Sequence, residues 1–343
     1  MARIQEMSYL SFYPEVLRLR RGLPIAPRMA IVHPTNRCQH RCSGCEYAAT
    51  RATSGTAPAS IDGDRLLSLI GEIRALGAAA ILFSGGGEPT LHHRFAEAVS
   101  SACEADLSVG IFSNGVNIRA PLANTIARHA SFVRISIDAA TAGTYQAIRG
   151  ADDFARCMEG FQALSEAKAC AGSTIQLGLK YLVRAENVGE ILAFCDLAEE
   201  LGAESVQFKP LRGDGELPPE GMREAQRLID RAKDQERRVR IVGGMPKDPK
   251  IEAPTCWINP LRVVVSAEGD VYLCNYFMHR RNTHVFGNIV EEPLQKIWFG
   301  TRHREAMGRI SASECCFFDC RFHKLNVQLR DLVTNHRDEL DFV

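Results

Sequence analysis

The sequence predicts an α/β protein: a partial (β/α)6 TIM-like barrel followed by a small C-terminal α+β domain. Between residues 29 and 212, six short apolar runs rich in Val and Ile alternate with longer amphipathic stretches. That alternation is typical of a parallel sheet with helical crossovers, and six units fall short of the eight that close a full barrel. After residue 250 two short strands flank a Glu-Gly-Asp turn, which predicts a hairpin.

The six predicted strands are apolar nearly throughout, as strands buried on both faces must be. The stretches between them have helical periodicity. In residues 64–77, for example, Leu and Ile recur at three- and four-residue spacing, and Gly77 ends the run. The strands are expected at residues 29–34, 79–86, 107–115, 132–139, 175–183 and 205–212.

Changes in composition divide the chain into four segments. An amphipathic N-terminal extension precedes the barrel core, and a turn-rich stretch with one charged helix connects the core to the C-terminal domain. That last domain is expected to contain the hairpin, at residues 261–274, and a helix at residues 293–307. The four segments are residues 1–28, 29–215, 216–249 and 250–343.

The overall charge and hydropathy argue against two classes of partner. The chain has 41 basic and 41 acidic residues, so no net charge would draw it to nucleic acid or to a membrane surface. Its apolar runs are too short to span a bilayer, and its start lacks the apolar core of a secretory signal. We therefore expect a cytoplasmic protein with neither nucleic acid nor membrane as a partner.

Twelve cysteines are many for a cytoplasmic chain of 343 residues. In the cytoplasm, clustered thiols bind metal or act as catalytic groups more often than they form stable disulfides. Two regions are crowded with cysteines, residues 38–45 and residues 256–320. The other four are expected to be small buried hydrophobic side chains, namely Cys103, Cys157, Cys170 and Cys195.

The first crowded region directly follows the first predicted strand, at the barrel rim that carries active-site loops. Cys38, Cys42 and Cys45 have the spacing C-x3-C-x2-C. Three thiolates on one loop can bind three corners of a cubane iron–sulfur cluster and leave the fourth iron without a protein ligand. A zinc site is the alternative, because zinc would take a fourth ligand such as His33 or His40.

A glycine-rich loop, SGGGEP, ends the second predicted strand at residues 84–89. Its small residues let the backbone approach a ligand closely, and the Glu88 carboxylate together with backbone carbonyls suits an ammonium group. Taken alone, the loop equally fits a tight turn.

The CxxxCxxC loop and the GGEP motif roughly forty residues after it resemble the radical S-adenosylmethionine (radical SAM) superfamily. The resemblance implies a [4Fe–4S] cluster on Cys38, Cys42 and Cys45, with SAM chelating the open iron. It also implies that Gly86, Gly87 and Glu88 bind the amino group of SAM.

One residue of the cysteine loop departs from the pattern of that superfamily. An aromatic residue usually precedes the third cysteine and lies near the adenine, but Gly44 stands at that position here. We expect Tyr47, two residues past the third cysteine, to take the role of that aromatic residue.

Polar residues follow the third and fourth predicted strands, where the resemblance implies contact with the ribose and carboxylate of SAM. Asn114 also fits a turn with Gly115, and Asp138 also fits a helix cap. The four residues with this expected role are Ser113, Asn114, Ser136 and Asp138.

Three basic residues lie near the rim of the predicted barrel. Arg149 ends a YQAIRG stretch similar to one frequent in the superfamily, and it is expected either to face a carboxylate or to form an ordinary salt bridge. Lys180 and Lys209 lie near the ends of the fifth and sixth strands. They either point into the barrel mouth, toward a ligand or an acid, or project outward.

The second group of cysteines resembles the SPASM/twitch extension of radical SAM enzymes. Two of them bracket the predicted hairpin, and three more follow within residues 315–320. Because a full SPASM domain with two clusters needs about seven or more cysteines, the resemblance implies a single auxiliary [4Fe–4S] cluster here. Its expected ligands are Cys256, Cys274, Cys316 and Cys320.

Cys315 is then a spare thiol, because adjacent residues point apart and Cys316 better fits the expected spacing. It is expected to be either inert and buried or a hydrogen-atom donor, which a redox-neutral epimerase needs. A structural zinc knuckle that also uses Asp319 and His323 is the alternative for the whole group.

The resemblance implies an oxidoreductase or epimerase that reductively cleaves SAM to a 5′-deoxyadenosyl radical, with electrons from a flavodoxin- or ferredoxin-type donor. That radical would take a hydrogen atom from a substrate held in the barrel. We expect a small polar substrate, such as a sugar or aminocyclitol, oxidised from alcohol to ketone or epimerised. About 28 residues precede the first strand, which is too few for a folded domain that binds a leader peptide.

Two alternatives remain at the level of the sequence. The first is a radical SAM maturase that crosslinks or epimerises a ribosomally made peptide. The second, from another class, is a non-catalytic module that binds zinc or an iron–sulfur cluster.

Overall fold

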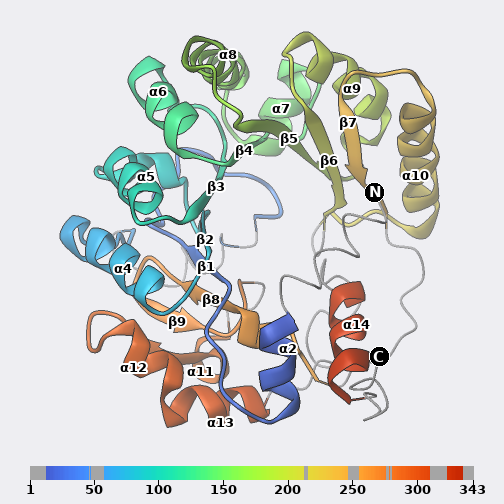
Figure 1. The fold of residues 1–343 in the computed structure, drawn as a ribbon. Helices are drawn as coiled ribbons and strands as arrows, with labels where there is room; N and C mark the ends of the chain where they lie inside the picture. The colour runs from blue at the N-terminus through green and yellow to red at the C-terminus, as the bar shows by residue number, and fades with distance from the viewer. Residues whose placement is uncertain are drawn as a thin grey trace.

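The computed structural model describes residues 13–45, 47, 58–211, 215–245, 255–275, 278, 280–309 and 323–334. Within these residues the strands form one ten-stranded sheet in the order β10-β9-β8-β1-β2-β3-β4-β5-β6-β7. The sheet curves into an open barrel with helices around its outside (Figure 1). The predicted α/β partial barrel is therefore confirmed.

The parallel part of the sheet follows chain order from β1 to β7. Each of the six strands predicted from apolar runs is present, shortened by one to three residues in most cases. β7 was not predicted, because it is short and only partly buried; it lies in the segment expected to be a linker. The strands are β1 (Met29–Val32), β2 (Ala80–Phe83), β3 (Ser108–Ser113), β4 (Phe132–Ser136), β5 (Gln176–Val183), β6 (Ser205–Pro210) and β7 (Arg240–Gly243).

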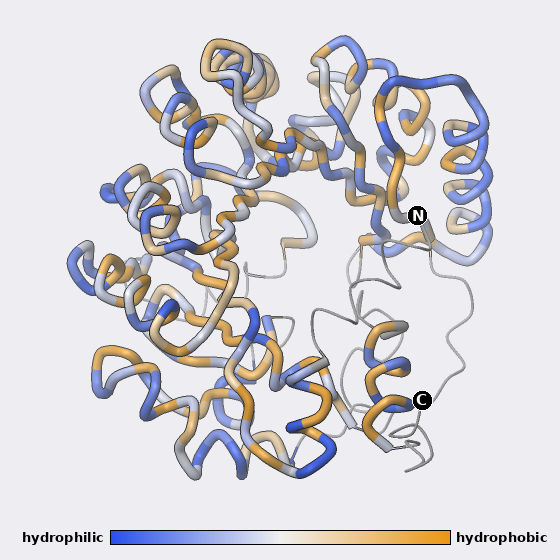
Figure 2. The backbone as a smooth tube through the Cα atoms, viewed as in Figure 1, coloured by the Kyte–Doolittle hydropathy of each residue, from blue (hydrophilic) through white to orange (hydrophobic). Residues whose placement is uncertain are grey.

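Amphipathic helices cover the outer face of these strands, and their apolar stripes turn toward the sheet (Figure 2). In the first of them, Leu66, Leu69 and Ile73 are buried, and Asp62 caps the N-terminus by accepting hydrogen bonds from two backbone amides. These helices are α4 (Gly63–Ala75), α5 (Phe95–Glu104), α6 (Ala120–His129), α7 (Ala142–Arg149), α8 (Phe154–Ala171), α9 (Ile191–Glu200) and α10 (Pro219–Asp234), with 3-10 turns η2 (Pro89–Leu91) and η3 (Val188–Glu190).

The predicted C-terminal hairpin is present, and it continues the barrel sheet rather than forming a sheet of its own. β8 (Arg262–Val265) pairs in parallel with β1. β9 (Asp270–Tyr272) pairs antiparallel with β8, and β10 (Val285–Asn288) pairs antiparallel with β9. The hairpin strand β8 thereby supplies the hydrogen bonds for the edge of β1 that β2 leaves open.

Short helices complete this end of the molecule. The helix predicted at residues 293–307 is broken at Gly300 into α12 and α13. The last described helix, α14, packs against α2, the first described helix of the chain (Figure 1). The helices are α2 (Tyr13–Arg20), α11 (Arg281–His284), α12 (Leu294–Phe299), α13 (Thr301–Arg309) and α14 (His323–Thr334), with the 3-10 turn η4 (Asn259–Leu261).

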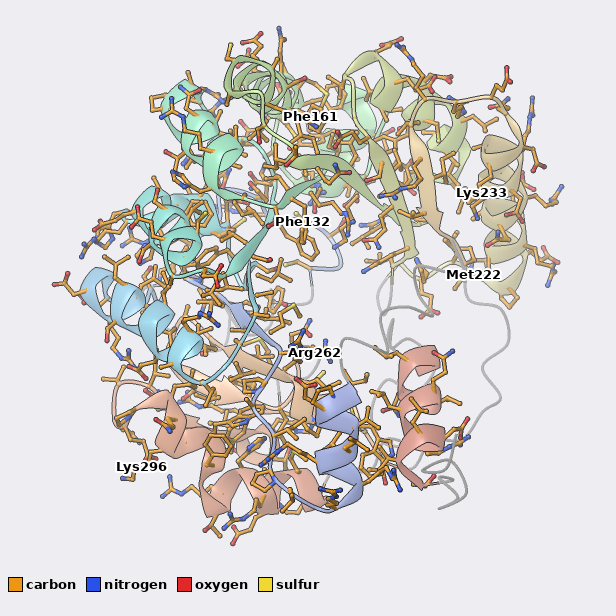
Figure 3. The ribbon with its side chains drawn as sticks, viewed as in Figure 1. Phe132, Phe161, Met222, Lys233, Arg262 and Lys296 are labelled. Atoms are coloured by element: carbon orange, nitrogen blue, oxygen red, sulfur yellow. The ribbon has the colours of Figure 1, made fainter. Side chains whose placement is uncertain are left out.

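Side chains alternate between the two faces of the sheet, as strand geometry requires. Ala30 and Val32 belong to the main core between the sheet and the outer helices. Ile31 instead joins Leu82 and Val264 in a smaller apolar cluster on the other face, which we call the inner face. Arg262 on β8 lies toward the middle of the molecule, whereas Lys296 on α12 projects at its periphery (Figure 3).

None of the helices within the described residues combines the length and the apolar character that crossing a membrane requires.

Candidate functional site

The cysteine loop, residues 33–45, follows β1 at its carboxyl end and is held by backbone hydrogen bonds on two sides. On one side Glu88 N donates to Arg37 O at 2.7 Å. On the other side Arg41 N donates to Arg149 O, and Ser43 N donates to Ile148 O, each at 3.0 Å. The glycine-rich loop and the end of α7 therefore fix the segment that carries Cys38, Cys42 and Cys45, all of which are partly exposed.

The glycines of the SGGGEP loop are needed because this loop packs directly on the cysteine loop. A Cβ atom on Gly86 would overlap the side chain of Asn36, and one on Gly87 would overlap the backbone of Arg37. Their expected contact with SAM stays a prediction. The structure adds a second reason for small residues here, the close approach of two loops.

The Glu88 carboxylate is buried and accepts hydrogen bonds from the protein itself. Its Oε1 accepts from Thr90 Oγ1 and from Ser113 Oγ, each at 2.7 Å, and more weakly from Thr90 N at 3.2 Å. Its Oε2 accepts from Asn114 N at 2.7 Å. Burial raises the pKa of Glu88, although these hydrogen bonds lower it. Glu88 and Ser113 therefore tie the glycine-rich loop to the end of β3.

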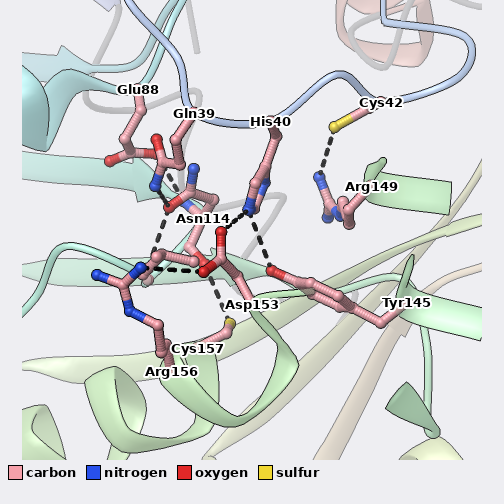
Figure 4. Close-up of polar contacts among 12 residues, drawn as sticks. Gln39, His40, Cys42, Glu88, Asn114, Tyr145, Arg149, Asp153, Arg156 and Cys157 are labelled. Atoms are coloured by element: carbon pink, nitrogen blue, oxygen red, sulfur yellow. Dashed lines mark hydrogen bonds and ion pairs between the residues drawn. The ribbon is translucent and has the colours of Figure 1, made fainter. Parts of the chain in front are cut away.

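Next to this network, two buried polar atoms lack a hydrogen-bond partner among the described residues. Gln39 Nε2 donates to Asn114 Oδ1 at 3.2 Å, which joins the cysteine loop to the end of β3 (Figure 4). Asn114 Nδ2 and Gln39 Oε1 remain without a partner. Buried amide atoms left in this state are costly unless a ligand or water satisfies them. A donor and an acceptor beside the three cysteines fit a polar cofactor such as SAM.

Asp138 and Arg149, both expected to contact SAM, form a buried ion pair with each other. Arg149 Nη2 lies 2.7 Å from Asp138 Oδ2, and Arg149 Nη1 lies 3.7 Å from Cys42 Sγ (Figure 4). Asp138 also accepts from Leu182 N at 2.7 Å. The carboxylate thus orients the guanidinium of Arg149 toward a cysteine of the loop.

The two histidines suggested as zinc ligands are both buried. His40 Nε2 lies 3.5 Å from Asp153 Oδ2 and 3.4 Å from Tyr145 Oη, so its ring is directed toward α7 and α8. His33 packs edge-on against Tyr47, with ring centroids 5.4 Å apart. Burial lowers the pKa of each histidine to about 4. Both rings are therefore neutral at physiological pH.

No three His, Cys, Asp or Glu side chains of the described residues form a group that could hold a single metal ion. A zinc ion needs all its ligands within about 2.3 Å of one point, whereas each thiolate of a cubane cluster binds a different iron. That the three thiols of the cysteine loop hold a cluster stays a prediction, which the guanidinium of Arg149 beside Cys42 supports.

The second cysteine group is only partly described. Cys256 precedes η4, and Cys274 follows β9, so both lie near the amino end of β8. Burial raises the pKa of the Cys256 thiol to about 11, although backbone hydrogen bonds from Asn259 and Ile258 and the charge of Arg262 lower it. Cys315, Cys316 and Cys320 lie outside the described residues, and their roles stay predictions.

The remaining expected site residues lie on the inner face. Tyr47 packs against the inner apolar cluster. Ser136 ends β4 and is paired in register with Lys180 on β5. Among the four scattered cysteines, Cys157 and Cys195 are buried as predicted and Cys103 is only partly buried, whereas Cys170 is exposed, so the prediction is wrong for Cys170.

Sequence reasoning missed two partners of the cysteine loop. Gln39 lies between two of the cysteines and contacts Asn114, but nothing in its sequence context marks it. Asn36 Nδ2 donates to Glu268 Oε1 at 2.6 Å, which links the loop to the turn of the C-terminal hairpin. The two residues are 232 positions apart, so no local pattern could have revealed this bond.

Two family models match this chain. The radical SAM superfamily matches residues 32–198, and an iron–sulfur cluster-binding domain, SPASM, matches residues 256–322. In the structural comparison, Streptococcus suis SuiB bound to its precursor peptide SuiA aligns with a TM-score of 0.68 and 13% identity, covering 86% of this chain and 69% of SuiB. At that identity the likeness concerns the fold.

Three relatives in sequence are similar over different lengths. An Fe-coproporphyrin III synthase of Methanosarcina barkeri is 25% identical and covers 82% of this chain and 78% of its own. A PqqA peptide cyclase of Streptomyces rochei is 24% identical, and the match covers 81% of this chain and 77% of the cyclase. The mycofactocin maturase MftC of Mycobacterium ulcerans is 33% identical, but over only 38% of this chain and 34% of its own.

Proposed function

Because the chain belongs to the radical SAM superfamily and carries a SPASM domain, with SAM and two [4Fe–4S] clusters as cofactors, we propose that it is a maturase that modifies a peptide. The observation that carries this proposal is that the glycine-rich loop packs against the cysteine loop and holds it in place. The relatives of this chain also include a peptide cyclase. A structural neighbour was also solved with a precursor peptide.

This proposal replaces the expectation of a sugar or aminocyclitol substrate. That expectation depended on the length of the segment before the first predicted strand. A peptide can instead be delivered by a separate chain, so the length of that segment does not limit the substrate. The PqqA peptide cyclase, the mycofactocin maturase and SuiB favour the peptide alternative.

In the proposed enzyme Cys38, Cys42 and Cys45 would hold the first cluster, and the buried amides of Gln39 and Asn114 would contact SAM. When bound, these groups supply the radical that removes a hydrogen atom from the substrate. The chain itself holds the cysteine loop in place from two sides. Apolar residues of the inner face, among them Ile31, Leu82 and Val264, would help to exclude water from the substrate.

The two cysteine groups would place their clusters at opposite ends of neighbouring strands. The cysteine loop follows the carboxyl end of β1, whereas Cys256 and Cys274 lie near the amino end of β8, and β1 and β8 are parallel. Each strand has four residues, or roughly 13 Å of length. An auxiliary cluster in that position suits the acceptance of an electron from the substrate.

A small-molecule substrate is the second candidate. The relative named Fe-coproporphyrin III synthase covers 82% of this chain, about as much as the peptide cyclase does. Oxidation, crosslinking and epimerisation all remain within the proposed function, because Cys315 lies outside the described residues.

Anaerobic reconstitution tests the proposal. We expect about eight irons per chain, from two clusters of four, and 5′-deoxyadenosine on reduction with dithionite in the presence of SAM. Cys42→Ala should lose about half of the iron and all of the 5′-deoxyadenosine, whereas Cys170→Ala, at an exposed thiol, should retain both. Small peptides encoded beside the gene should change mass on incubation with the enzyme. A fully loaded enzyme that does not cleave SAM would refute the proposal.

A further inference from the structure

We propose that Asn326 on α14 is a positioning residue for the auxiliary cluster. Its side-chain amide holds the backbone on both sides of Cys256 and thereby fixes the direction in which the Cys256 sulfur points. This inference rests on the proposed function, in which Cys256 is a ligand of the second [4Fe–4S] cluster. The spacing of the cysteines in the sequence does not mark Asn326.

The amide of Asn326 forms one hydrogen bond on each side of Cys256. Asn326 Oδ1 accepts from Trp257 N at 2.6 Å, and Asn326 Nδ2 donates to Thr255 O at 3.0 Å. Both bonds go to backbone groups, which lie 69 and 71 positions from Asn326 along the chain. An amide group is both a donor and an acceptor, so one side chain can fix the backbone before and after the cysteine.

The backbone after Cys256 turns its amides toward the sulfur. Ile258 N and Asn259 N both donate to Cys256 Sγ. Hydrogen bonds to the ligand sulfurs are one of the factors that set the reduction potential of an iron–sulfur cluster. The donors around Cys256 therefore fit a cluster ligand. They reach the sulfur only while the backbone of residues 255–259 keeps its path, which is what Asn326 holds.

Asn326 is itself fixed by the packing of its helix. It is only 5% exposed, and Leu329, three residues further on α14, is fully buried. Leu329 belongs to an apolar cluster with Val16 and Ile258, against which Cys256 and other residues pack. The helix also packs on α2 (Figure 1). The amide thus reaches the Cys256 loop from a well-packed helix.

The place of Asn326 in the sequence gives the two hydrogen bonds a further consequence. α14 begins at His323, shortly after Cys320, which is another expected ligand of the auxiliary cluster. Each thiolate of a cubane cluster binds a different iron, so the segments that carry the ligands must keep a set separation. Asn326 connects the segment around Cys256 to the helix that follows Cys320. Loss of its bonds should therefore affect the auxiliary cluster more than the rest of the fold.

The first test measures iron in the full-length protein after anaerobic reconstitution. Asn326→Leu keeps a branched side chain and removes both hydrogen bonds. We expect it to contain about four irons instead of about eight, as Cys256→Ala should. Val327→Ala is the matched control, because it shortens the next buried side chain of α14 and removes no hydrogen bond to the loop. It should keep about eight irons.

The second test measures the reduction potential of the auxiliary cluster in the Cys42→Ala variant, which should retain only that cluster. Adding Asn326→Asp keeps an acceptor for Trp257 N, removes the donor to Thr255 O and places a negative charge beside the loop. We expect a more negative potential, because the charge disfavours the reduced cluster, or loss of the cluster. Gln328→Glu adds the same charge at an exposed position of α14 and should shift the potential less.

Three results would overturn the inference. The first is about eight irons in Asn326→Leu. The second is an equal loss of iron in Val327→Ala, which would assign the effect to the stability of α14. The third is a potential in the Asn326→Asp protein equal to that in the Gln328→Glu protein. These measurements require no turnover, so they are separate from a failure of wild type to bind iron or cleave SAM, which would refute the proposed function instead.

Discussion

Gly44 adopts a left-handed backbone conformation, with φ of +67°. An L-residue at such a position costs roughly 1–2 kcal/mol, and glycine does not. This accounts for the missing aromatic residue before the third cysteine, which the sequence marked as a departure but could not explain. A side chain there would strain the loop that carries the cluster ligands.

Arg149 and Asp138 show how a residue's role can differ from the role its motif suggests. The sequence predicted that Arg149 would face a carboxylate, and it does, but the carboxylate belongs to Asp138 rather than to a ligand. The pair is buried and links β4, α7 and Cys42. Their expected contacts with SAM stay predictions.

Arg149→Gln should make the reduction potential of the first cluster more negative. It removes a positive charge 3.7 Å from Cys42 Sγ and leaves the Asp138 carboxylate uncompensated. At an effective dielectric constant of about 20, a charge at this range contributes roughly 4 kcal/mol, which is on the order of 100–200 mV in a one-electron potential. The double variant Arg149→Gln/Asp138→Asn removes both charges and should shift it less. Redox titration monitored by electron paramagnetic resonance measures the reduction potential of the first cluster in wild type and in both variants. Equal potentials in the three proteins would contradict the electrostatic role of Arg149.

Most elements of the barrel could be predicted from the sequence, because each strand is a buried apolar run and each helix has one apolar face. β7 was missed because its residues are exposed or only partly buried, so it lacks the continuous apolar character of a central strand. The helix predicted at residues 293–307 is broken because Gly300 ends α12 in an extended conformation. In both places the local pattern of apolar residues did not indicate the secondary structure that formed.

The packing of the glycine-rich loop on the cysteine loop gives a prediction for these two elements. Gly87→Ala should displace the cysteine loop, because the new Cβ would overlap backbone atoms of Asn36 and Arg37. We expect the variant to lose most of the iron of the first cluster while keeping its auxiliary iron. Gly71→Ala, in the middle of α4 with open space around it, is the control, and should raise stability by about 0.5–1 kcal/mol. Normal iron content in Gly87→Ala would show that the loops do not need this contact.

At the scale of the whole molecule, the C-terminal segment is part of the same sheet as the barrel. β8 pairs with β1 across more than two hundred residues of sequence. The bond between Asn36 and Glu268 then links the cysteine loop to the hairpin turn. The environment of the first cysteine group therefore depends on residues near the second.

Glu268→Ala should loosen the cysteine loop at a distance in sequence. A hydrogen bond to a charged group contributes about 1.5–3 kcal/mol, so amides near Asn36 should exchange hydrogen faster in the variant, by roughly ten-fold or more. Hydrogen exchange with mass spectrometry measures this. Glu291→Ala, at an exposed position after β10, is the control. If exchange in the cysteine loop is the same in both variants, the hairpin does not stabilise the loop.

The sequence by itself determined the fold class, the three-cysteine loop, the glycine-rich loop and the presence of a second cysteine group. These features depend on the spacing of cysteines and glycines and on the periodicity of apolar residues, which can be read from segments of a few tens of residues. Only the tertiary structure decided that Asp138 pairs with Arg149, that Asn36 reaches Glu268, and that Lys180 and Lys209 face inward beside Arg134. Those contacts join residues on different strands and loops, so they depend on sheet order and register, which no single segment of the sequence contains.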